Sequence, residues 1–317
     1  MRRTASLALL ALCAPLAAAP VPAPYGILLL AHGGDSSWNA EVARLRRRVD
    51  AKVPTESALG MADPAALQSA VLRLEKRGVT RIVAVPLFVQ SRSEVLDQTR
   101  YALGLSDKPS EALRDGLERM AKAHAAAAKA RGAHGAHAAH GSPAHGHSME
   151  FSTARVKSRG PIALADALDD HALVGRILVE RAKALSRDAA KETVVLVAHG
   201  PVDEAAVDAW RASLASLCRS FAGFRGCAHA LLRDDAAPEI RAAAVADLRA
   251  LVSRAKAEDG RAVVIPVLIA RGGIEKKIVK DLDGLDYAWD GRTLMPHDGF
   301  DAWVLERAAS VEWSGRP

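Results

Sequence analysis

Two segments of this chain repeat the same pattern, and the repeat restricts the possible folds more strongly than any other feature. An apolar run ending in Ala-His-Gly begins at Gly26, and a second one begins at Val194. In each half a later apolar run contains a proline, Pro86 or Pro266, and a helical pattern carrying a glutamate follows it. Apolar runs of this length, bounded by glycine, are typical of buried parallel strands. The repeat therefore predicts two similar α/β domains.

The remaining segments fit the same plan. Further strands are predicted at residues 55–62, 161–168, 227–234 and 292–299. A helical pattern follows each of these strands, at residues 63–78, 169–185, 237–260 and 300–309. Strands that alternate with helices form a parallel sheet with helices on both faces. We therefore predict a protein of the α/β class, with two similar doubly wound parallel-sheet domains of four strands each and a cleft between them.

The domain boundaries follow from the repeat and from the composition of the segments between its copies. The first domain is predicted to span residues 25–190 and the second residues 191–317. The first domain contains an insert, at about residues 105–160, that is rich in Ala and Lys and then in Gly and His. Such a composition cannot build a core, and a connection this long inside a domain is a functional or a disordered insertion.

The N-terminus has the layout of a secretory signal peptide. Residues 1–19 hold two arginines, an apolar run and then small residues ending at Ala19. The apolar run is short for a bilayer span, so we expect cleavage, export to a periplasm and no stable membrane insertion of the mature protein. An uncleaved anchor and a lipoprotein modified at Cys13 remain as alternatives. The net charge of +6 is dispersed along the chain, which argues against a nucleic-acid partner.

Two histidines and two glutamates occupy matching positions in the repeat. His32 and His199 end their strands, and Glu94 and Glu275 lie at the start of the helix after the second strand motif. Ligands of such sheets bind beyond the carboxyl ends of the strands, where these side chains are expected. Imidazole is a good ligand for divalent cobalt, iron, nickel or zinc, and a carboxylate can bind metal or accept protons. The alternative roles are helix capping and packing for the histidines, and a favourable helix-dipole position for the glutamates.

The insert supplies a second group of candidate metal ligands. Its histidines are His134, His137, His140, His145 and His147. Their His-x-x-His and His-x-His spacings permit chelation by a flexible loop, as an accessory metal site. The alternative is a low-complexity linker that binds metal only incidentally.

Cys218 and Cys227 are the only cysteines left after removal of residues 1–19. In an oxidising compartment they can form a disulfide, provided that the fold brings their Cα atoms close enough. The sequence alone leaves the disulfide and two free thiols as open alternatives.

The chain resembles the class II tetrapyrrole chelatases, in particular the sirohydrochlorin cobaltochelatases and ferrochelatases. The resemblance is carried by LLLAHGG with DSSWNAEV and by VLVAHGP with VDEAAVDAW, and further by VAVPLFV and VIPVLIARGG. It implies a lyase-type reaction in which a divalent metal is inserted into a tetrapyrrole, and it implies metal binding by His32 and His199. Small members of the family carry a second histidine after the proline motif, where this chain has Glu94 in one half and Ile274 beside Glu275 in the other.

The function expected from the resemblance is insertion of Co²⁺, Fe²⁺ or Ni²⁺ into a tetrapyrrole such as sirohydrochlorin, a reaction of cobalamin and related biosynthesis. The metal is a substrate, and no organic cofactor is expected. The partners are the macrocycle and the metal ion, and the internal duplication favours a monomer. A non-catalytic periplasmic carrier of metal or tetrapyrrole on the same fold is the alternative, and a solute-binding protein is a third hypothesis.

Overall fold

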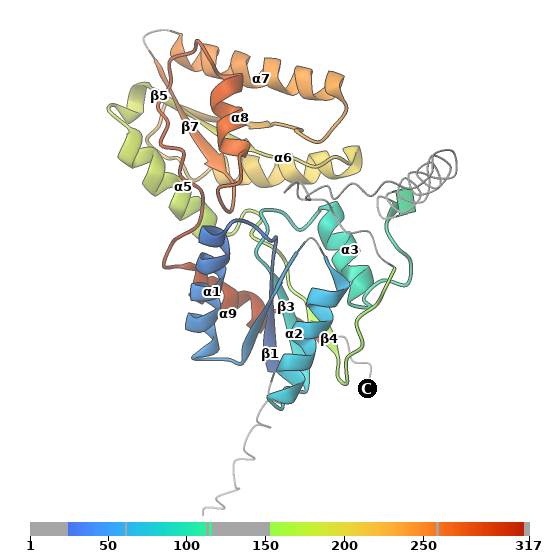
Figure 1. Ribbon diagram of the computed structural model, residues 1–317. Coiled ribbons are helices and arrows are strands. Elements are labelled where there is room, and N and C mark those ends of the chain that lie inside the picture. The colour runs from blue at the N-terminus through green and yellow to red at the C-terminus, as the bar shows by residue number, and fades with distance from the viewer. Residues whose placement is uncertain (1–24, 61, 112–113, 116–152, 258–259, 314–317) are drawn as a thin grey trace, which may run out of the picture.

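The computed structural model describes residues 25–60, 62–111, 114–115, 153–257 and 260–313, which form two parallel α/β sheets with helices on both faces (Figure 1). The first sheet has the strand order β2-β1-β3-β4, and the second has the order β6-β5-β7. The strands are β1 (Tyr25–Ala31), β2 (Thr55–Leu59), β3 (Arg81–Pro86), β4 (Ile162–Leu164), β5 (Glu192–Ala198), β6 (Gly226–Leu231) and β7 (Arg261–Val267). The predicted α/β class is confirmed. The predicted signal peptide and the histidines of the insert lie outside the described residues.

The helices follow the strands as the sequence pattern requires. They are α1 (Ser36–Asp50), α2 (Pro64–Lys76), α3 (Glu94–Ala102), α5 (Ala172–Leu185), α6 (Glu204–Cys218), α7 (Pro238–Lys256), α8 (Ile274–Asp281) and α9 (Phe300–Ala309), with a short 3₁₀ helix at Ala189–Lys191. Several begin at the capping residues that the sequence offers. The Asp63 carboxylate accepts the backbone N–H groups of Ala65 and Ala66 ahead of α2, which has proline in its first turn.

The duplication holds at the level of single residues. In the first sheet Leu30 pairs with Pro86, and in the second Val197 pairs with Pro266. The residues two places further along each central strand are His32 and His199. The two Ala-His-Gly segments therefore leave their sheets at equivalent points, as the repeat predicted.

The fourth strand predicted at residues 292–299 is not formed, and this part of the prediction was wrong. The fourth position of the second sheet holds a single bridge between Val263 and Ala288. Gly291 has a φ of +64°, outside the range of a β-strand, and Pro296 has no N–H to donate to a strand ladder. Only two backbone bonds follow along the extension of β7, from Leu294 N to Leu268 O and from Met295 N to Ile269 O.

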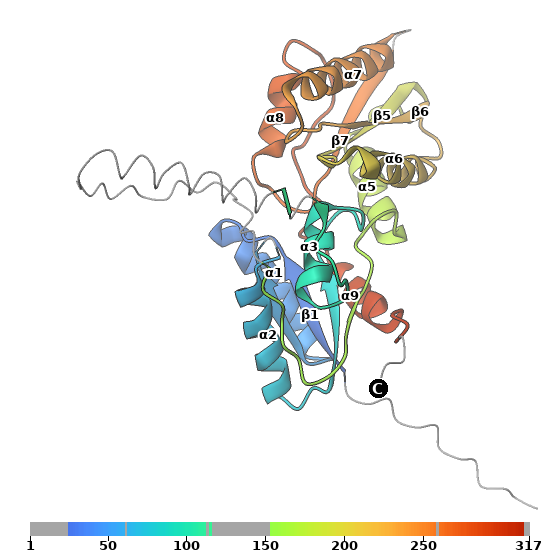
Figure 2. The same cartoon turned by 90° about the vertical axis from the view of Figure 1, so that its right-hand side faces the viewer.

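Two helices each pack against the sheet that they do not adjoin in sequence. Helix α5 follows the first sheet in sequence but packs against β7 and α6 of the second domain. Helix α9 follows the second sheet but packs against α1 and β3 of the first, and Figures 1 and 2 show it in red beside the first domain. The starts of the two helices are in close contact. A Cβ atom added to Gly299, just before α9, would lie only 2.5 Å from the side chain of Leu173 on α5.

This exchange joins the two domains through one hydrophobic core. The largest cluster of buried side chains takes in residues from both sheets and from α1, α5, α6 and α9. Two smaller clusters lie on the outer faces, one under α2 and α3 and one under α7 and α8. Because non-polar burial is the main force that holds layers together, the shared cluster fixes the domains to each other.

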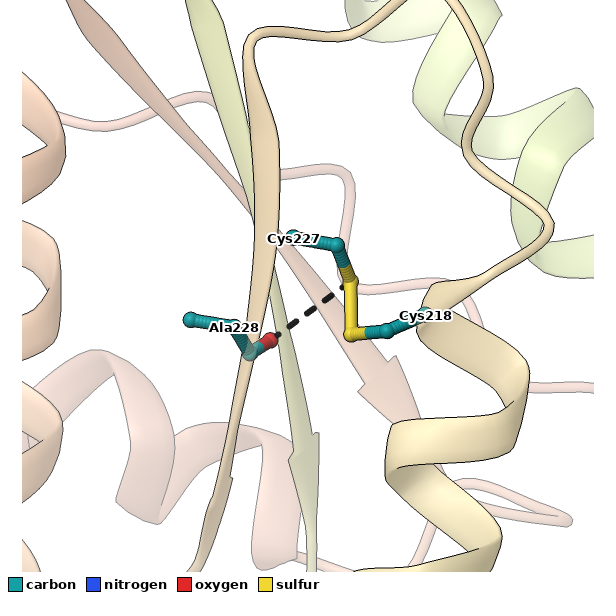
Figure 3. Close-up of a disulfide and its surroundings, with 3 residues drawn as sticks. All are labelled: Cys218, Cys227 and Ala228. Atoms are coloured by element: carbon teal, nitrogen blue, oxygen red, sulfur yellow. Dashed lines mark hydrogen bonds between the residues drawn. A yellow bond between two sulfur atoms is a disulfide. The ribbon is translucent and has the colours of Figure 1, made fainter.

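Cys218 and Cys227 form a disulfide between the C-terminal end of α6 and β6 (Figure 3). Their Cα atoms are 5.4 Å apart, within the range that a disulfide requires. The structure thus selects the disulfide over two free thiols. It ties the helix that follows His199 to the edge strand of the same sheet.

Replacing both cysteines with serine is expected to lower the free energy of unfolding by about 2–3 kcal/mol, because the cross-link restricts a short loop of the unfolded chain. Urea titration of the oxidised protein and of the double variant measures the difference. Adding a reductant should bring the wild-type protein to the stability of the variant. Equal stability of the two under oxidising conditions would contradict the prediction.

None of the helices in the described part of the chain is both long enough and apolar enough to cross a membrane.

Candidate functional site

His199 lies immediately beyond β5, at the carboxyl edge of the second sheet. The parallel pairing continues past the strand ends, since Leu232 N donates to Ala198 O and Arg233 N donates to His199 O. The chain after β6 is thereby held beside the histidine. Two acidic residues, Asp234 and Asp235, follow in that segment.

His199, Asp234 and Asp235 form a group whose ligand atoms all lie within 4.8 Å of one another. The Nε2 atom of His199 is 3.2 Å from Oδ2 of Asp235, and its Nδ1 atom is 2.8 Å from the carbonyl oxygen of Gly200. A ring N–H donated to a backbone carbonyl is the arrangement that directs the other nitrogen of a histidine at a metal. One imidazole and two carboxylates are a suitable donor set for a divalent transition metal.

The surroundings of His199 raise the pKa of its imidazole. Burial lowers the pKa of the imidazole, but the hydrogen bonds to Asp235 and Gly200 and the negative charges of Asp235 and Asp234 outweigh burial and raise it. The hydrogen bond from His199 in turn lowers the pKa of Asp235. A metal ion that binds Nε2 would take the place of the contact between His199 and Asp235.

Arg233 and Gly200 fix the backbone that carries His199. Arg233 is 6% exposed; its Nε donates to Pro201 O at 2.7 Å and its Nη2 donates to Val202 O at 3.0 Å. Gly200 has a φ of +82°, and a Cβ there would lie 3.1 Å from Arg233 and from Leu231. Only glycine fits this turn without strain, which gives the Gly of the Ala-His-Gly motif a structural cause.

Asp234 is held by two cations from neighbouring helices. Its side chain is 6% exposed, and Oδ1 accepts a hydrogen bond from Arg241 Nε of α7 at 3.0 Å. Its Oδ2 is paired with the ammonium of Lys277 on α8. The two interactions give each oxygen of this buried carboxylate a cationic partner and place the segment that includes Asp235 next to His199.

His32 occupies the equivalent point of the first domain but has different surroundings. Its Nδ1 is 3.2 Å from the carbonyl oxygen of Gly33, which repeats the contact of His199 with Gly200. Its ring stacks on Trp38 at 5.0 Å between centroids, and Trp38 Nε1 donates to His32 O. Within the described ranges, His32 is not part of a group of three candidate ligands such as that around His199.

Glu94 reaches from the first domain to the loop that follows His199. Its Oε1 accepts hydrogen bonds from Val202 N at 3.0 Å and Asp203 N at 2.7 Å, at the start of α6. Nearby, Trp210 Nε1 of α6 donates to Arg92 O. The carboxyl edge of the first sheet therefore faces the histidine loop of the second. A cleft large enough for a tetrapyrrole at this edge remains a prediction.

Glu275 is occupied within its own turn. Its Oε2 accepts the backbone N–H groups of Gly272 and Gly273 at 3.2 and 3.1 Å, ahead of α8. The structure brings His199 together with Asp234 and Asp235, and the carboxylate of Glu275 is outside that group. Its predicted roles as ligand and proton acceptor are not tested by this arrangement.

The sequence analysis missed Asp234 and Asp235. It assigned Asp234 to the end of a predicted strand and gave Asp235 no role. The available signal was their place, since two acidic residues follow the strand that neighbours the strand of His199. The carboxyl ends of adjacent parallel strands lie at one edge, so such a pair belongs with the histidine.

Known proteins share this fold and part of this sequence. The sequence pattern of the CbiX family matches residues 26–95, a segment that includes both His32 and Glu94. No curated protein matches the chain in sequence.

Three solved structures superpose on most of the chain. SirB from Bacillus subtilis with Fe³⁺ matches with a TM-score of 0.53 and 13% identity, over 90% of this chain and 94% of that one. SirB from Bacillus subtilis subspecies spizizenii, a sirohydrochlorin chelatase in complex with cobalt, matches at 0.51 and 12%, with the same coverage. CbiX, described as the terminal enzyme for siroheme biosynthesis in denitrifying bacteria, matches at 0.52 and 17%, over 90% of this chain and all of that one.

The chain shares the fold of SirB and CbiX, with two parallel-sheet domains. The resemblance to the class II chelatase family is confirmed, by sequence over residues 26–95 and by fold over 90% of the chain.

Proposed function

We propose that this protein is a metal chelatase that inserts a divalent metal into a sirohydrochlorin-like tetrapyrrole, with the second domain as the metal-binding half. The group of His199, Asp234 and Asp235 is the observation that supports this proposal most directly. Co²⁺, Fe²⁺ and Ni²⁺ are the candidate substrates, since all three suit an imidazole and carboxylates. The two SirB structures hold Fe³⁺ and cobalt in those proteins.

In this proposal His199 and Asp235 hold the metal ion at the carboxyl edge of the second sheet, opposite the first domain. The macrocycle lies between the domains with its pyrrole nitrogens directed at the ion. Two N–H protons leave the ring as the metal enters, so each turnover requires a proton acceptor. Glu275 and Glu94 are the acceptors that the sequence suggests.

The experiment is anaerobic incubation of the protein with Co²⁺ and sirohydrochlorin, followed by the absorbance of the macrocycle. Conversion of many equivalents of macrocycle per protein supports the chelatase. Binding of one equivalent without conversion supports a carrier of metal or tetrapyrrole. The carrier is favoured by one observation: one oxygen of Glu94 and one oxygen of Glu275 each accept two backbone N–H groups, which gives both residues a structural role.

Glu275→Gln separates a catalytic role of this residue from a structural one. If Glu275 accepts pyrrole protons, the amide variant should lose at least tenfold in turnover while it retains its affinity for the macrocycle. If Glu275 only orders the turn ahead of α8, turnover should be unchanged and stability should fall by a few tenths of a kcal/mol. Stopped-flow absorbance and thermal unfolding of the same samples make the comparison. Full turnover in both Glu275→Gln and Glu94→Gln would exclude the two glutamates as bases.

Export to the periplasm and an accessory role of the insert are further parts of the proposal. The disulfide between Cys218 and Cys227 supports export, because disulfides persist in oxidising compartments. The histidines of the insert are proposed to gather metal and not to take part in catalysis. The same assay at limiting Co²⁺, on a chain that lacks residues 131–149, distinguishes this role from that of a plain linker.

A further inference from the structure

The two cations that pair with Asp234, Arg241 and Lys277, differ in how firmly they are held. Arg241 is 18% exposed and also holds Asp281 of α8, with Nη2 2.5 Å from Oδ2. The two hydrogen bonds lock this guanidinium between α7 and α8. Lys277, by contrast, is 52% exposed and reaches Asp234 with a flexible stem from the surface of α8. Of the two cations, only the lysine can leave the carboxylate without disturbing a buried network.

The position that Lys277 occupies is also the position that a metal ion needs. Both oxygens of Asp234 are engaged, Oδ1 by Arg241 and Oδ2 by Lys277. A metal bound by all three members of the His199 group needs one oxygen of Asp234. Oδ2 is the oxygen whose cation is exposed and can move away. The charge of Lys277 also acts on Asp235, whose pKa is lowered first by the hydrogen bond with His199 and further by the charges of His199 and Lys277.

We propose that Lys277 is an internal competitor for the metal: its ammonium neutralises Asp234 while the site holds no ion, and it has to leave before Asp234 can become a ligand. This inference rests on the proposed metal site at His199. It gives the site a moderate affinity, because the energy of metal binding is reduced by the loss of the ion pair and by repulsion between the ammonium and the ion. A chelatase has to release its metal to the macrocycle, and a tethered cation that returns to Asp234 favours that release.

The test is the affinity of Lys277→Met for Co²⁺, measured by competition with a chromophoric chelator. The Co²⁺ binding that remains in His199→Ala is subtracted, so that binding to other histidines does not enter the comparison. Lys277→Met should bind Co²⁺ about fivefold more tightly than the wild-type protein. Lys276→Met is the matched control, because it removes the same charge from an exposed neighbour on α8 and should leave the affinity within about twofold.

Repeating the Lys277→Met comparison in a protein that also carries Asp234→Asn shows whether the gain in Co²⁺ affinity depends on Asp234. In Asp234→Asn the carboxylate that the lysine and the metal share is gone, so adding Lys277→Met should give a clearly smaller gain, which comes from relief of charge repulsion alone. Unchanged or weaker binding by Lys277→Met would overturn the proposal, and so would equal gains in Lys276→Met or in the Asp234→Asn background. Circular dichroism confirms that each variant is folded. If the wild-type protein and His199→Ala bind Co²⁺ alike, the metal site itself is refuted, a result distinct from the failure of Lys277 alone.

Discussion

His199→Ala is expected to weaken the tightest Co²⁺ binding of this protein at least tenfold and to slow metallation of the macrocycle to a similar degree. A tenfold loss corresponds to about 1.4 kcal/mol, a modest value for removing one ligand from a site with few ligands. The fold should survive, because the imidazole is 30% exposed and the loop is held by backbone groups and by Arg233. Isothermal titration and the absorbance assay measure the two effects.

His229→Ala and His32→Ala are the controls for this result. His229 lies on β6, half-buried, and burial followed by the charge of Arg211 lowers its pKa, but it is not part of the metal group. Its replacement should leave Co²⁺ affinity unchanged. His32→Ala reports on the first domain: a loss there equal to that of His199→Ala would mean that both halves bind metal. If His199→Ala and His32→Ala both leave affinity and metallation intact, the Ala-His-Gly histidines are not ligands.

The sequence was sufficient for the repeat, for seven of the eight predicted strands and for placing the two histidines at strand ends, because each depends on local pattern. Buried parallel strands are continuous apolar runs, and Pro86 and Pro266 mark the same register in both sheets. The histidines could be placed because a residue that follows such a strand must lie at the carboxyl edge.

Local sequence pattern could not predict the acidic partners of His199, nor which sheet α5 and α9 pack against. Asp234 and Asp235 resemble any polar pair between a strand and a helix, and only the pairing of β6 with β5 brings them to the histidine. The helical periodicity of α5 and α9 shows that each buries one face but not which sheet covers it. The disulfide likewise depended on a separation of 5.4 Å that spacing along the chain does not give.

Glu94 illustrates a different reason for an incomplete prediction. Its matched position with Glu275 suggested one shared role, yet the two carboxylates bind backbone N–H groups in different places. Glu275 binds within its own turn, whereas Glu94 binds the loop of the other domain. Equivalent positions in a repeat share a backbone environment. The side chain of one copy can nevertheless bind to the neighbouring domain, as Glu94 does.

Phe300→Ala is expected to destabilise the first domain, although Phe300 follows the second domain in sequence. Its side chain is fully buried, and it packs edge to face on Trp303 with ring centroids 6.0 Å apart. Truncating a buried phenylalanine to alanine costs about 3–5 kcal/mol through lost burial and the cavity that remains. Because α9 contacts α1 and β3, the loss falls on the first sheet. Urea unfolding gives the total effect, and hydrogen exchange locates it.

The amides whose hydrogen exchange becomes faster show which domain α9 stabilises: the first domain, against which it packs, or the second, which it follows in sequence. If α9 supports the first domain, amides of β1 and β3 should exchange faster in Phe300→Ala than in the wild-type protein, and those of β5 should change less. Leu72→Ala serves as the control, since Leu72 on α2 is 44% exposed and its truncation should cost no more than about 0.5 kcal/mol. Faster exchange that begins in β5 and β7 would instead assign α9 to the second domain. The shared core then could not couple the His199 loop to the first domain through α9. The hydrogen bonds that Glu94, Trp210 and Gln90 make between the first domain and α6 would remain to couple them.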